Sequence, residues 1–205
     1  MEKTATFISD SFEIEGRLFE GDKDRGVVIT HPHPLYGGNM HNNVVGAISL
    51  ACQKIGFTSL KFNFRGVGGS QGNYDDGHGE QEDVRAAVAH LTDMGIRQIV
   101  LAGYSFGAWI NALAVNDGLV VDSMIMVSPP VAFIEFTSIS GLSPLKLVIT
   151  GSRDDIAPAN MIATSIPIWN PAAKFEVLSG ADHFYGGYED KLEAVLTDFL
   201  AKENS

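Results

Sequence analysis

The segment 103–107, Gly-Tyr-Ser-Phe-Gly, has the residue types and the spacing that prepare a serine hydroxyl for nucleophilic attack. The apolar run 98–102 precedes it, and small and apolar residues typical of a helix follow at once. In this strand–turn–helix context, G-x-S-x-G makes a tight turn that holds the serine above the sheet. Both glycines are needed because larger residues would collide with the strand and the helix. We therefore predict that Ser105 is a nucleophile.

A second match to the same pattern, centred on Ser70, shows that the pattern alone is weak evidence. The chain contains 22 glycines, so chance matches are expected. A glycine-rich stretch separates Ser70 from the predicted strand 57–64, and the turn cluster 73–77 follows in place of a helix. Ser70 therefore lacks the context that Ser105 has.

A serine nucleophile needs a base, usually a histidine that a carboxylate holds in the right tautomer. His183, one of six histidines, lies between the last predicted strand and the last predicted helix, where the chain order serine, acid, histidine places the base. The acid is expected just after the predicted strand 145–150, where Asp154 and Asp155 both qualify and the neighbouring glycine and proline favour Asp154. Asp182 is a weaker candidate, because adjacent side chains rarely point at each other.

Two backbone N–H groups usually stabilise the negative oxygen of the tetrahedral intermediate in acyl transfer. One is expected from Phe106, the residue after the serine. The other is expected from the loop 31–39, His-Pro-His-Pro-Leu-Tyr-Gly-Gly-Asn, which follows the first predicted parallel strand. Proline has no N–H. His33 is therefore the first candidate for the second donor and Leu35 is the next.

Apolar strands alternate with amphipathic helices along most of the chain. Two extended segments, 5–9 and 13–20, come first. The strands predicted after them are 26–30, 57–64, 98–102, 121–127, 145–150 and 174–178, and the predicted helices are 42–54, 80–94, 106–116, 159–166 and 188–201. Continuous runs of Val, Ile and Leu are typical of parallel strands covered on both faces. We predict an α/β fold with a mostly parallel central sheet, helices on both faces, and functional residues after the strand ends.

Residues 128–144, between two of these strands, have room for one short helix and a loop, so we expect a minimal cap or none. The apolar side chains in this segment form either a rim around the site or a cover over the sheet; they are Phe133, Ile134, Phe136 and Leu142. A site without a lid favours small, accessible esters over long-chain lipids.

Length and composition fit one domain, residues 1–205, with a core that needs no disulfide. The net charge of −11 argues against nucleic acid and anionic membranes as partners, because both need clustered Lys and Arg. Cys52 is the only cysteine, so no disulfide can form within the chain. We recognise no signal peptide and no run long enough to span a bilayer, and we expect a cytoplasmic protein.

The chain resembles the α/β-hydrolase superfamily, in particular a group of small bacterial hydrolases without a lid that are dienelactone-hydrolase-like and carboxylesterase-like. The matching segments are 31–38, 63–70, 103–107, 151–158 and 180–184. Dienelactone hydrolases proper carry cysteine at the elbow, where this chain has Ser105. The resemblance implies a serine hydrolase, with Ser105, His183 and Asp154 as its triad, that cleaves small acyl esters or thioesters and needs no metal or organic cofactor. Lactonases and amidases share this machinery.

Two other interpretations stay open at this point. His31 and His33, with His41 and His78, could contribute to a metal site, although no ligand-spaced motif supports one. His31 could instead fix the loop 31–39 by hydrogen bonding. The fold could also serve as a non-catalytic binding or scaffold protein, although the three triad residues stand in order. Arg65 either binds an acidic substrate group or pairs with a nearby carboxylate, and local pairing is the commoner case.

Overall fold

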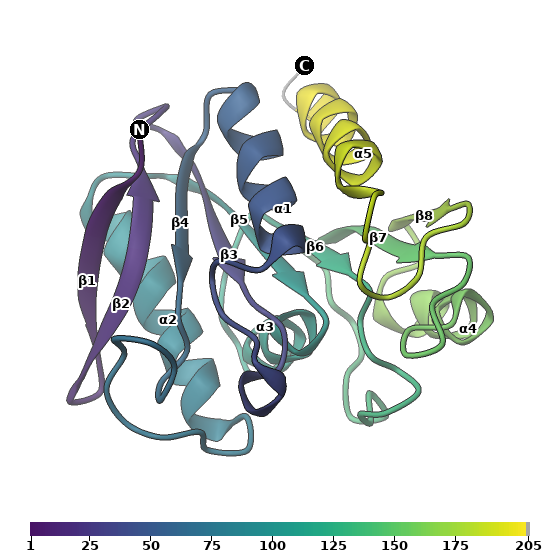
Figure 1. Ribbon diagram of the computed structural model, residues 1–205, viewed down its shortest axis with the longest axis horizontal. Coiled ribbons are helices and arrows are strands. Elements are labelled where there is room, and N and C mark those ends of the chain that lie inside the picture. The colour runs from purple at the N-terminus through teal and green to yellow at the C-terminus, as the bar shows by residue number, and fades with distance from the viewer. Residues whose placement is uncertain (204–205) are drawn as a thin grey trace.

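Strands and helices alternate along most of residues 1–203, the part of the chain that the computed structural model describes (Figure 1). The strands are β1 (Lys3–Ser9), β2 (Phe12–Phe19), β3 (Arg25–Thr30), β4 (Thr58–Phe62), β5 (Gln98–Tyr104), β6 (Ser123–Val127), β7 (Leu145–Gly151) and β8 (Lys174–Leu178). The helices are η1 (Pro34–Tyr36), a single 3₁₀ turn, and α1 (Asn43–Lys54), α2 (His78–Asp93), α3 (Phe106–Asn116), α4 (Ala159–Trp169) and α5 (Glu189–Glu203). The predicted elements are all present, with ends that differ by a few residues.

All eight of these strands form one sheet, in the order β1-β2-β4-β3-β5-β6-β7-β8. The hairpin β1–β2 joins it antiparallel to β4, and the pairs from β4 through β8 are parallel. The prediction of an α/β fold with a mostly parallel sheet is therefore confirmed.

Helices cover both faces of the sheet, as predicted. On one face α1 and α5 lie side by side (Figure 1), and Val44 and Leu196 belong to the core beneath them. On the other face α2, α3 and α4 pack over a second core that includes Val84, Ile110 and Ile162. Within residues 1–203, no helix is both long and apolar enough to cross a membrane.

The parallel strands end together at one edge of the sheet. Thr30 at the end of β3 pairs with Gly103 of β5, and Tyr104 pairs with Val127 at the end of β6. The loops that follow these strands therefore start side by side. Ligands of open α/β sheets bind at this edge, so the fold brings the predicted site residues to the expected place.

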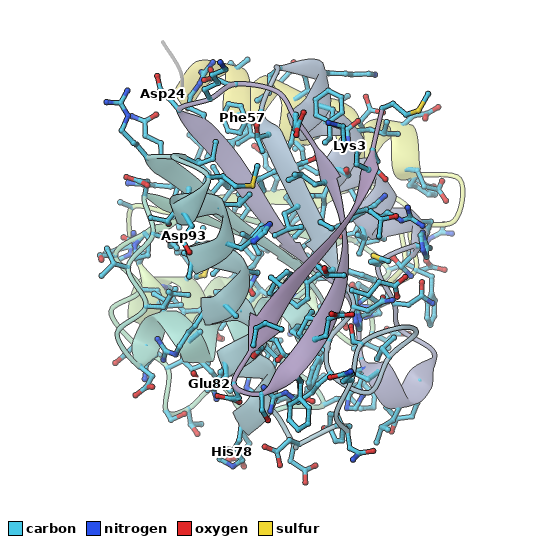
Figure 2. The ribbon with its side chains drawn as sticks, turned by 90° about the vertical axis from the view of Figure 1, so that its left-hand side faces the viewer. Lys3, Asp24, Phe57, His78, Glu82 and Asp93 are labelled. Atoms are coloured by element: carbon cyan, nitrogen blue, oxygen red, sulfur yellow. The ribbon has the colours of Figure 1, made fainter. Side chains whose placement is uncertain are left out.

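The opposite ends of the molecule are marked in Figure 2. Asp24 and Phe57, which precede β3 and β4, lie at the top of the view, whereas His78, the first residue of α2, lies at the bottom. Helix α2 thus begins at the edge of the sheet where the parallel strands end.

The segment 128–144 holds turns and no helix. Pro129 and Pro130 have no N–H to donate, and the Pro130 carbonyl accepts from the N–H groups of Phe133 and Ile134 in an isolated turn. Phe136 is buried in the core, whereas Phe133 is exposed. The segment therefore mainly covers the sheet, and the short helix for which the sequence left room is absent.

His31, directly after β3, ties the loop 31–39 to the end of β4. Its Nε2 accepts from the Phe64 N–H at 3.0 Å. Because that nitrogen must be unprotonated to accept, Nδ1 carries the hydrogen and donates to the Pro32 carbonyl at 2.6 Å. Burial lowers the pKa of His31 from 6.5 to about 4. The ring is therefore neutral, and both of its nitrogens form hydrogen bonds with backbone groups.

We expect His31 to make the fold sensitive to acid. Its folded pKa lies below the unfolded value, so between pH 6.5 and about 4 the unfolded chain binds a proton that the folded protein excludes. Stability therefore falls as the pH drops, by about 3 kcal/mol across this window. Glutamine can keep both hydrogen bonds without titrating. Urea unfolding of His31→Gln at about pH 7 and about pH 4.5 should show a smaller loss of stability than wild type.

The matched control is His41→Gln, which changes an exposed histidine and should keep the wild-type pH dependence. An equal loss of stability in wild type and His31→Gln would contradict the assignment of this acid sensitivity to His31.

Candidate active site

Ser105 occupies the turn between β5 and α3 with an unusual backbone conformation. Its φ is 54° and its ψ is −119°. Residues other than glycine rarely adopt these backbone angles. The Ser105 N–H donates to the Val127 carbonyl at 2.9 Å, and its own carbonyl accepts from the N–H groups of Ala108 and Trp109. These bonds hold the strained residue on both sides.

The two glycines of the motif are required by close contacts. A Cβ on Gly103 would lie 2.6 Å from Asn111 Nδ2 and 2.7 Å from the Ala108 nitrogen. A Cβ on Gly107 would lie 2.6 Å from Thr30 Oγ1 and 2.8 Å from the His31 oxygen. Helix α3 can therefore approach β3 and β5 only because both positions lack side chains.

His183 links Ser105 to Asp154 in one hydrogen-bonded chain. Its Nε2 lies 3.0 Å from Ser105 Oγ, and its Nδ1 lies 3.0 Å from each carboxylate oxygen of Asp154. All three side chains are buried. A carboxylate only accepts, so Nδ1 carries the hydrogen and Nε2 is free to accept from the serine hydroxyl. This is the tautomer that a base for Ser105 needs.

Asp154 is the acid whose side chain contacts that of His183. The two alternatives, Asp155 and Asp182, do not make this contact. Its Oδ1 accepts from the N–H groups of Ile156 at 3.0 Å and Ala157 at 2.7 Å. Asp155 is exposed. The sequence favoured Asp154 over Asp155 on the neighbouring glycine and proline alone, and the fold turns only Asp154 toward His183.

Asp182 has a different task. Its Oδ1 accepts from the N–H groups of Phe184 and Tyr185 and so shapes the loop that carries His183.

The Asp154 carboxylate stays charged although it is buried. Burial raises the pKa of Asp154, but His183 lowers it by hydrogen bonding and by charge, and the hydrogen bond from the Ala157 N–H lowers it further. The net pKa is below the ordinary value. The carboxylate is therefore ionised at neutral pH and can stabilise a protonated His183.

Two unpaired N–H groups lie on the segments where the sequence predicted them. Among the described residues, no acceptor faces the N–H of Phe106, at the start of α3, or that of His33. The Leu35 N–H, the second candidate, donates to His33 Nδ1 at 3.3 Å. The rings of His33 and Phe106 lie 4.5 Å apart between centroids, so the loop 31–39 packs directly against the elbow.

The other sequence candidates have structural contacts. The Ser70 hydroxyl donates to the Asn63 carbonyl at 2.6 Å and accepts from the Glu15 N–H at 3.0 Å. Arg65 is buried and pairs with Asp83 at 2.8 Å, as the local interpretation expected. Ser70 therefore fixes a turn and Arg65 is held by a carboxylate.

The metal interpretation finds no support in the donor set. Both ring nitrogens of His31 are occupied by backbone groups. Residues 1–203 contain no group of three or more His, Cys, Asp or Glu side chains that could hold a metal ion.

Sequence reasoning missed three buried hydroxyl groups around the triad. Tyr104 donates to the His183 carbonyl at 2.7 Å, and the hydroxyls of Ser128 and Tyr185 lie 2.8 Å apart. Ser128 directly follows β6, so the rule that functional residues follow strand ends could have found it. The two tyrosines carry no local signal, because their partners are distant in sequence.

A family model, described as "Alpha/beta hydrolase family", matches residues 47–202 of this chain. A curated relative, the uncharacterized protein RP471 of Rickettsia prowazekii (strain Madrid E), is 33% identical over 199 residues, which cover 91% of this chain and 84% of that protein.

Solved structures agree with these sequence matches. An alpha-beta serine hydrolase homologue from Coxiella burnetii superposes with a TM-score of 0.89 at 33% identity, covering 97% of each chain. A serine hydrolase without a lid from Xanthomonas campestris superposes with a TM-score of 0.88 at 26% identity, covering 98% of this chain and 94% of that one. The predicted likeness to small lidless bacterial hydrolases is confirmed, and the chain belongs to the alpha/beta hydrolase family.

Proposed function

We propose that this protein is a serine hydrolase that cleaves small acyl esters or thioesters through a covalent acyl-enzyme. The observation that carries the proposal is the unbroken chain Ser105–His183–Asp154, in which Oγ and Nε2 lie 3.0 Å apart and the Nδ1 hydrogen is held by the carboxylate. The likeness to serine hydrolase homologues supports the same chemistry.

The proposed reaction has two half-reactions. Ser105 Oγ attacks the acyl carbon while His183 Nε2 takes its proton, and the bond to the leaving group breaks as His183 gives the proton to the departing alcohol or thiol. Water then attacks the acyl-enzyme by the same route, releasing the carboxylic acid and restoring the serine. Asp154 stays ionised throughout and stabilises the imidazolium.

In this proposal the N–H groups of Phe106 and His33 stabilise the negative oxygen of each tetrahedral intermediate. Both are without an acceptor among the described residues and belong to segments in ring contact. Leu35 is the weaker choice because its N–H already has a partner. Such donors act strongly because they are fixed before the charge develops.

The segment 128–144 supports a small substrate. It forms turns that cover the sheet, with no cap domain above the serine. The acyl groups and leaving groups we propose are therefore short. We also propose action in the cytoplasm, since the one cysteine, Cys52, is buried and unpaired.

Ser105 should be the residue that reacts with a fluorescent fluorophosphonate. Labelling should be lost in Ser105→Ala and kept in Ser70→Ala, whose hydroxyl only fixes a turn. On short-chain esters, Ser105→Ala and His183→Ala should each lower kcat by about 10⁴-fold, because the nucleophile or its base is gone. Wild-type protein that neither labels nor hydrolyses any ester or thioester of the panel would refute the proposal, and the scaffold interpretation would replace it.

The acid assignment has its own test. Asp154→Asn removes the charge behind His183 and should lower kcat by about 10⁴-fold. The matched control, Asp155→Asn, changes an exposed neighbour and should stay within about twofold of wild type. Steady-state kinetics on one ester would compare them, and a larger loss in Asp155→Asn would overturn the assignment.

The second oxyanion donor can be tested by removing a single N–H. His33 has a φ of −55°, which proline can adopt. His33→Pro should lower kcat by about 10²-fold or more, whereas His33→Ala, which loses the ring and keeps the N–H, should lose much less. Equal losses in the two variants would mean that the ring and not the N–H matters.

A further inference from the structure

Both ends of the loop 31–39 are attached just after β4, by two residues that are neighbours in sequence. At the first end, the Phe64 N–H donates to His31 Nε2 at 3.0 Å. At the other end, the Met40 N–H donates to Asn63 Oδ1 at 2.9 Å. Met40 and Asn63 are both buried, with exposures of 0% and 3%. The loop is therefore held at two points, and the side chain of Asn63 forms the second.

The segment that leads into Met40 packs against the backbone of Pro32 and His33. The Gly38 N–H donates to the His33 carbonyl at 3.0 Å. A Cβ on Gly38 would lie 2.7 Å from the His33 oxygen and still closer to the Pro32 oxygen. Because Gly38 is only two residues from Met40, the bond between Met40 and Asn63 limits how far this backbone can move.

The peptide between Pro32 and His33 carries the N–H that we propose as the second oxyanion donor. Its oxygen, that of Pro32, accepts from His31 Nδ1 at 2.6 Å. The peptide bond is trans, so its N–H points in the direction opposite to its C=O and away from His31. The direction of this donor is thus set within the loop, whereas its position depends on what holds the two ends of the loop.

The amide of Asn63 has one correct orientation. Its Nδ2 donates to Glu15 Oε2 at 2.9 Å, and its Oδ1 accepts from the Met40 N–H. A carboxylate only accepts and a backbone N–H only donates, so a reversed amide would lose both bonds. The Gly69 N–H, which donates to the same oxygen at 2.8 Å, lowers the pKa of Glu15 most, and Asn63 lowers it further against the effect of burial. The charged Glu15 therefore fixes which atom of Asn63 faces Met40.

The backbone of Asn63 is fixed as firmly as its side chain. Asn63 directly follows β4, which pairs with β2. Its N–H donates to the Glu15 carbonyl at 2.9 Å, and its carbonyl accepts from the Ser70 hydroxyl at 2.6 Å. Asn63 therefore extends the sheet, and the end of the loop that it holds is tied to the sheet.

We propose that Asn63 is a positioning residue, which fixes the His33 N–H near Ser105 by holding the backbone of Met40, and that Glu15 orients the Asn63 amide for this task. The inference rests on the proposed function for its kinetic consequences. A donor to the negative oxygen is effective when it is in place before the charge develops, and a displacement of about 1 Å can cost about 10²-fold in rate. Loss of the bond to Met40 should therefore destabilise the tetrahedral intermediate more than the bound ester.

Steady-state kinetics of Asn63→Ala on a short-chain ester tests this distinction. The kcat should fall about tenfold with KM within about twofold of wild type, because only the charged intermediate uses the donor. A short-chain alkyl trifluoromethyl ketone, whose carbonyl adds the serine and becomes an oxyanion, should bind about tenfold more weakly. An unchanged kcat, or a loss confined to KM, would overturn the proposal.

The sharpest comparison uses His33→Pro, which lacks the donor N–H. Because Asn63 acts through that N–H, adding Asn63→Ala to His33→Pro should change kcat by less than about twofold, and a double-mutant cycle measures this non-additivity. A residue that only supports the fold would cost the same factor in both backgrounds. A further tenfold loss in the double variant would therefore contradict the positioning role.

The part played by Glu15 has its own variants. Asn63→Asp keeps an oxygen for the Met40 N–H but places a second carboxylate against Glu15, and it should lower kcat about as much as Asn63→Ala. Adding Glu15→Gln makes the contact an amide–carboxylate pair again and should recover most of this loss. A double variant as slow as Asn63→Asp would refute the role given to Glu15.

Asn170→Ala is the matched control for the loss of an amide that joins two segments. Asn170 Nδ2 donates to the carbonyls of Ser143 at 3.2 Å and Leu145 at 3.0 Å. Leu145 begins β7, so these bonds lie at the edge of the sheet away from the triad. Urea unfolding would compare the stability of the two alanine variants. Asn170→Ala should keep kcat within about twofold of wild type, and an equal loss of kcat in both variants would count against a specific role for Asn63.

The attachment of the loop can also be measured without turnover. Amide hydrogen exchange of peptides that cover residues 36–40 should be about tenfold faster in Asn63→Ala than in wild type and unchanged in Asn170→Ala. Faster exchange in a protein whose wild type hydrolyses nothing would refute the proposed function and keep the attachment. Active protein in which Asn63→Ala changes neither exchange nor kcat would do the reverse.

Discussion

The close approach of α3 to the ends of β3 and β5 is the constraint on which the rest of the site depends. The first turn of this helix lies against Thr30 and His31, with no room for a Cβ at Gly103 or Gly107. A side chain at either position would push the helix away from the sheet, and Ser105 and the Phe106 N–H would move with it. Because β3, β5 and β6 end in register, the loop 31–39 and Ser128 start beside this contact.

Two buried titratable groups of the site, Asp154 and His31, differ in charge: Asp154 is ionised and His31 is neutral. Their surroundings explain the difference. Asp154 accepts hydrogen bonds from backbone N–H groups and from His183, so it stays ionised despite burial. His31 faces one donor and one acceptor, which suits a neutral ring, and the effect of burial on its pKa outweighs the opposite effect of the hydrogen bond to the Pro32 carbonyl. In both cases the bonds that choose the protonation state also fix the side chain. Charge and geometry at this site are therefore set together.

The sequence was sufficient to predict the elements, a mostly parallel sheet and the grouping of Ser105, His183 and Asp154, because each of these residues lies within five residues after the end of a strand and strand ends have local signals. It favoured Asp154 over Asp155 without settling the choice, since that choice depends on which side chain faces a loop that is 29 residues away. It could not predict Ser128 with Tyr185, whose hydroxyls meet across 57 residues. It also could not tell which N–H groups of the loop 31–39 lack an acceptor. Contacts between distant segments decide all of these points.

Three residues near His183, namely Ser105, Ser128 and Tyr185, have a positive φ, which has a consequence for the evolution of the protein. Backbone conformations of this kind cost on the order of 1–3 kcal/mol each, against a net stability of about 5–15 kcal/mol for a typical domain. Glycine at position 105 would relax the chain but remove the hydroxyl that contacts His183. Selection for stability and selection for the serine–histidine–aspartate arrangement therefore oppose each other at position 105. The large core on both faces of the sheet is what lets the molecule tolerate that conflict.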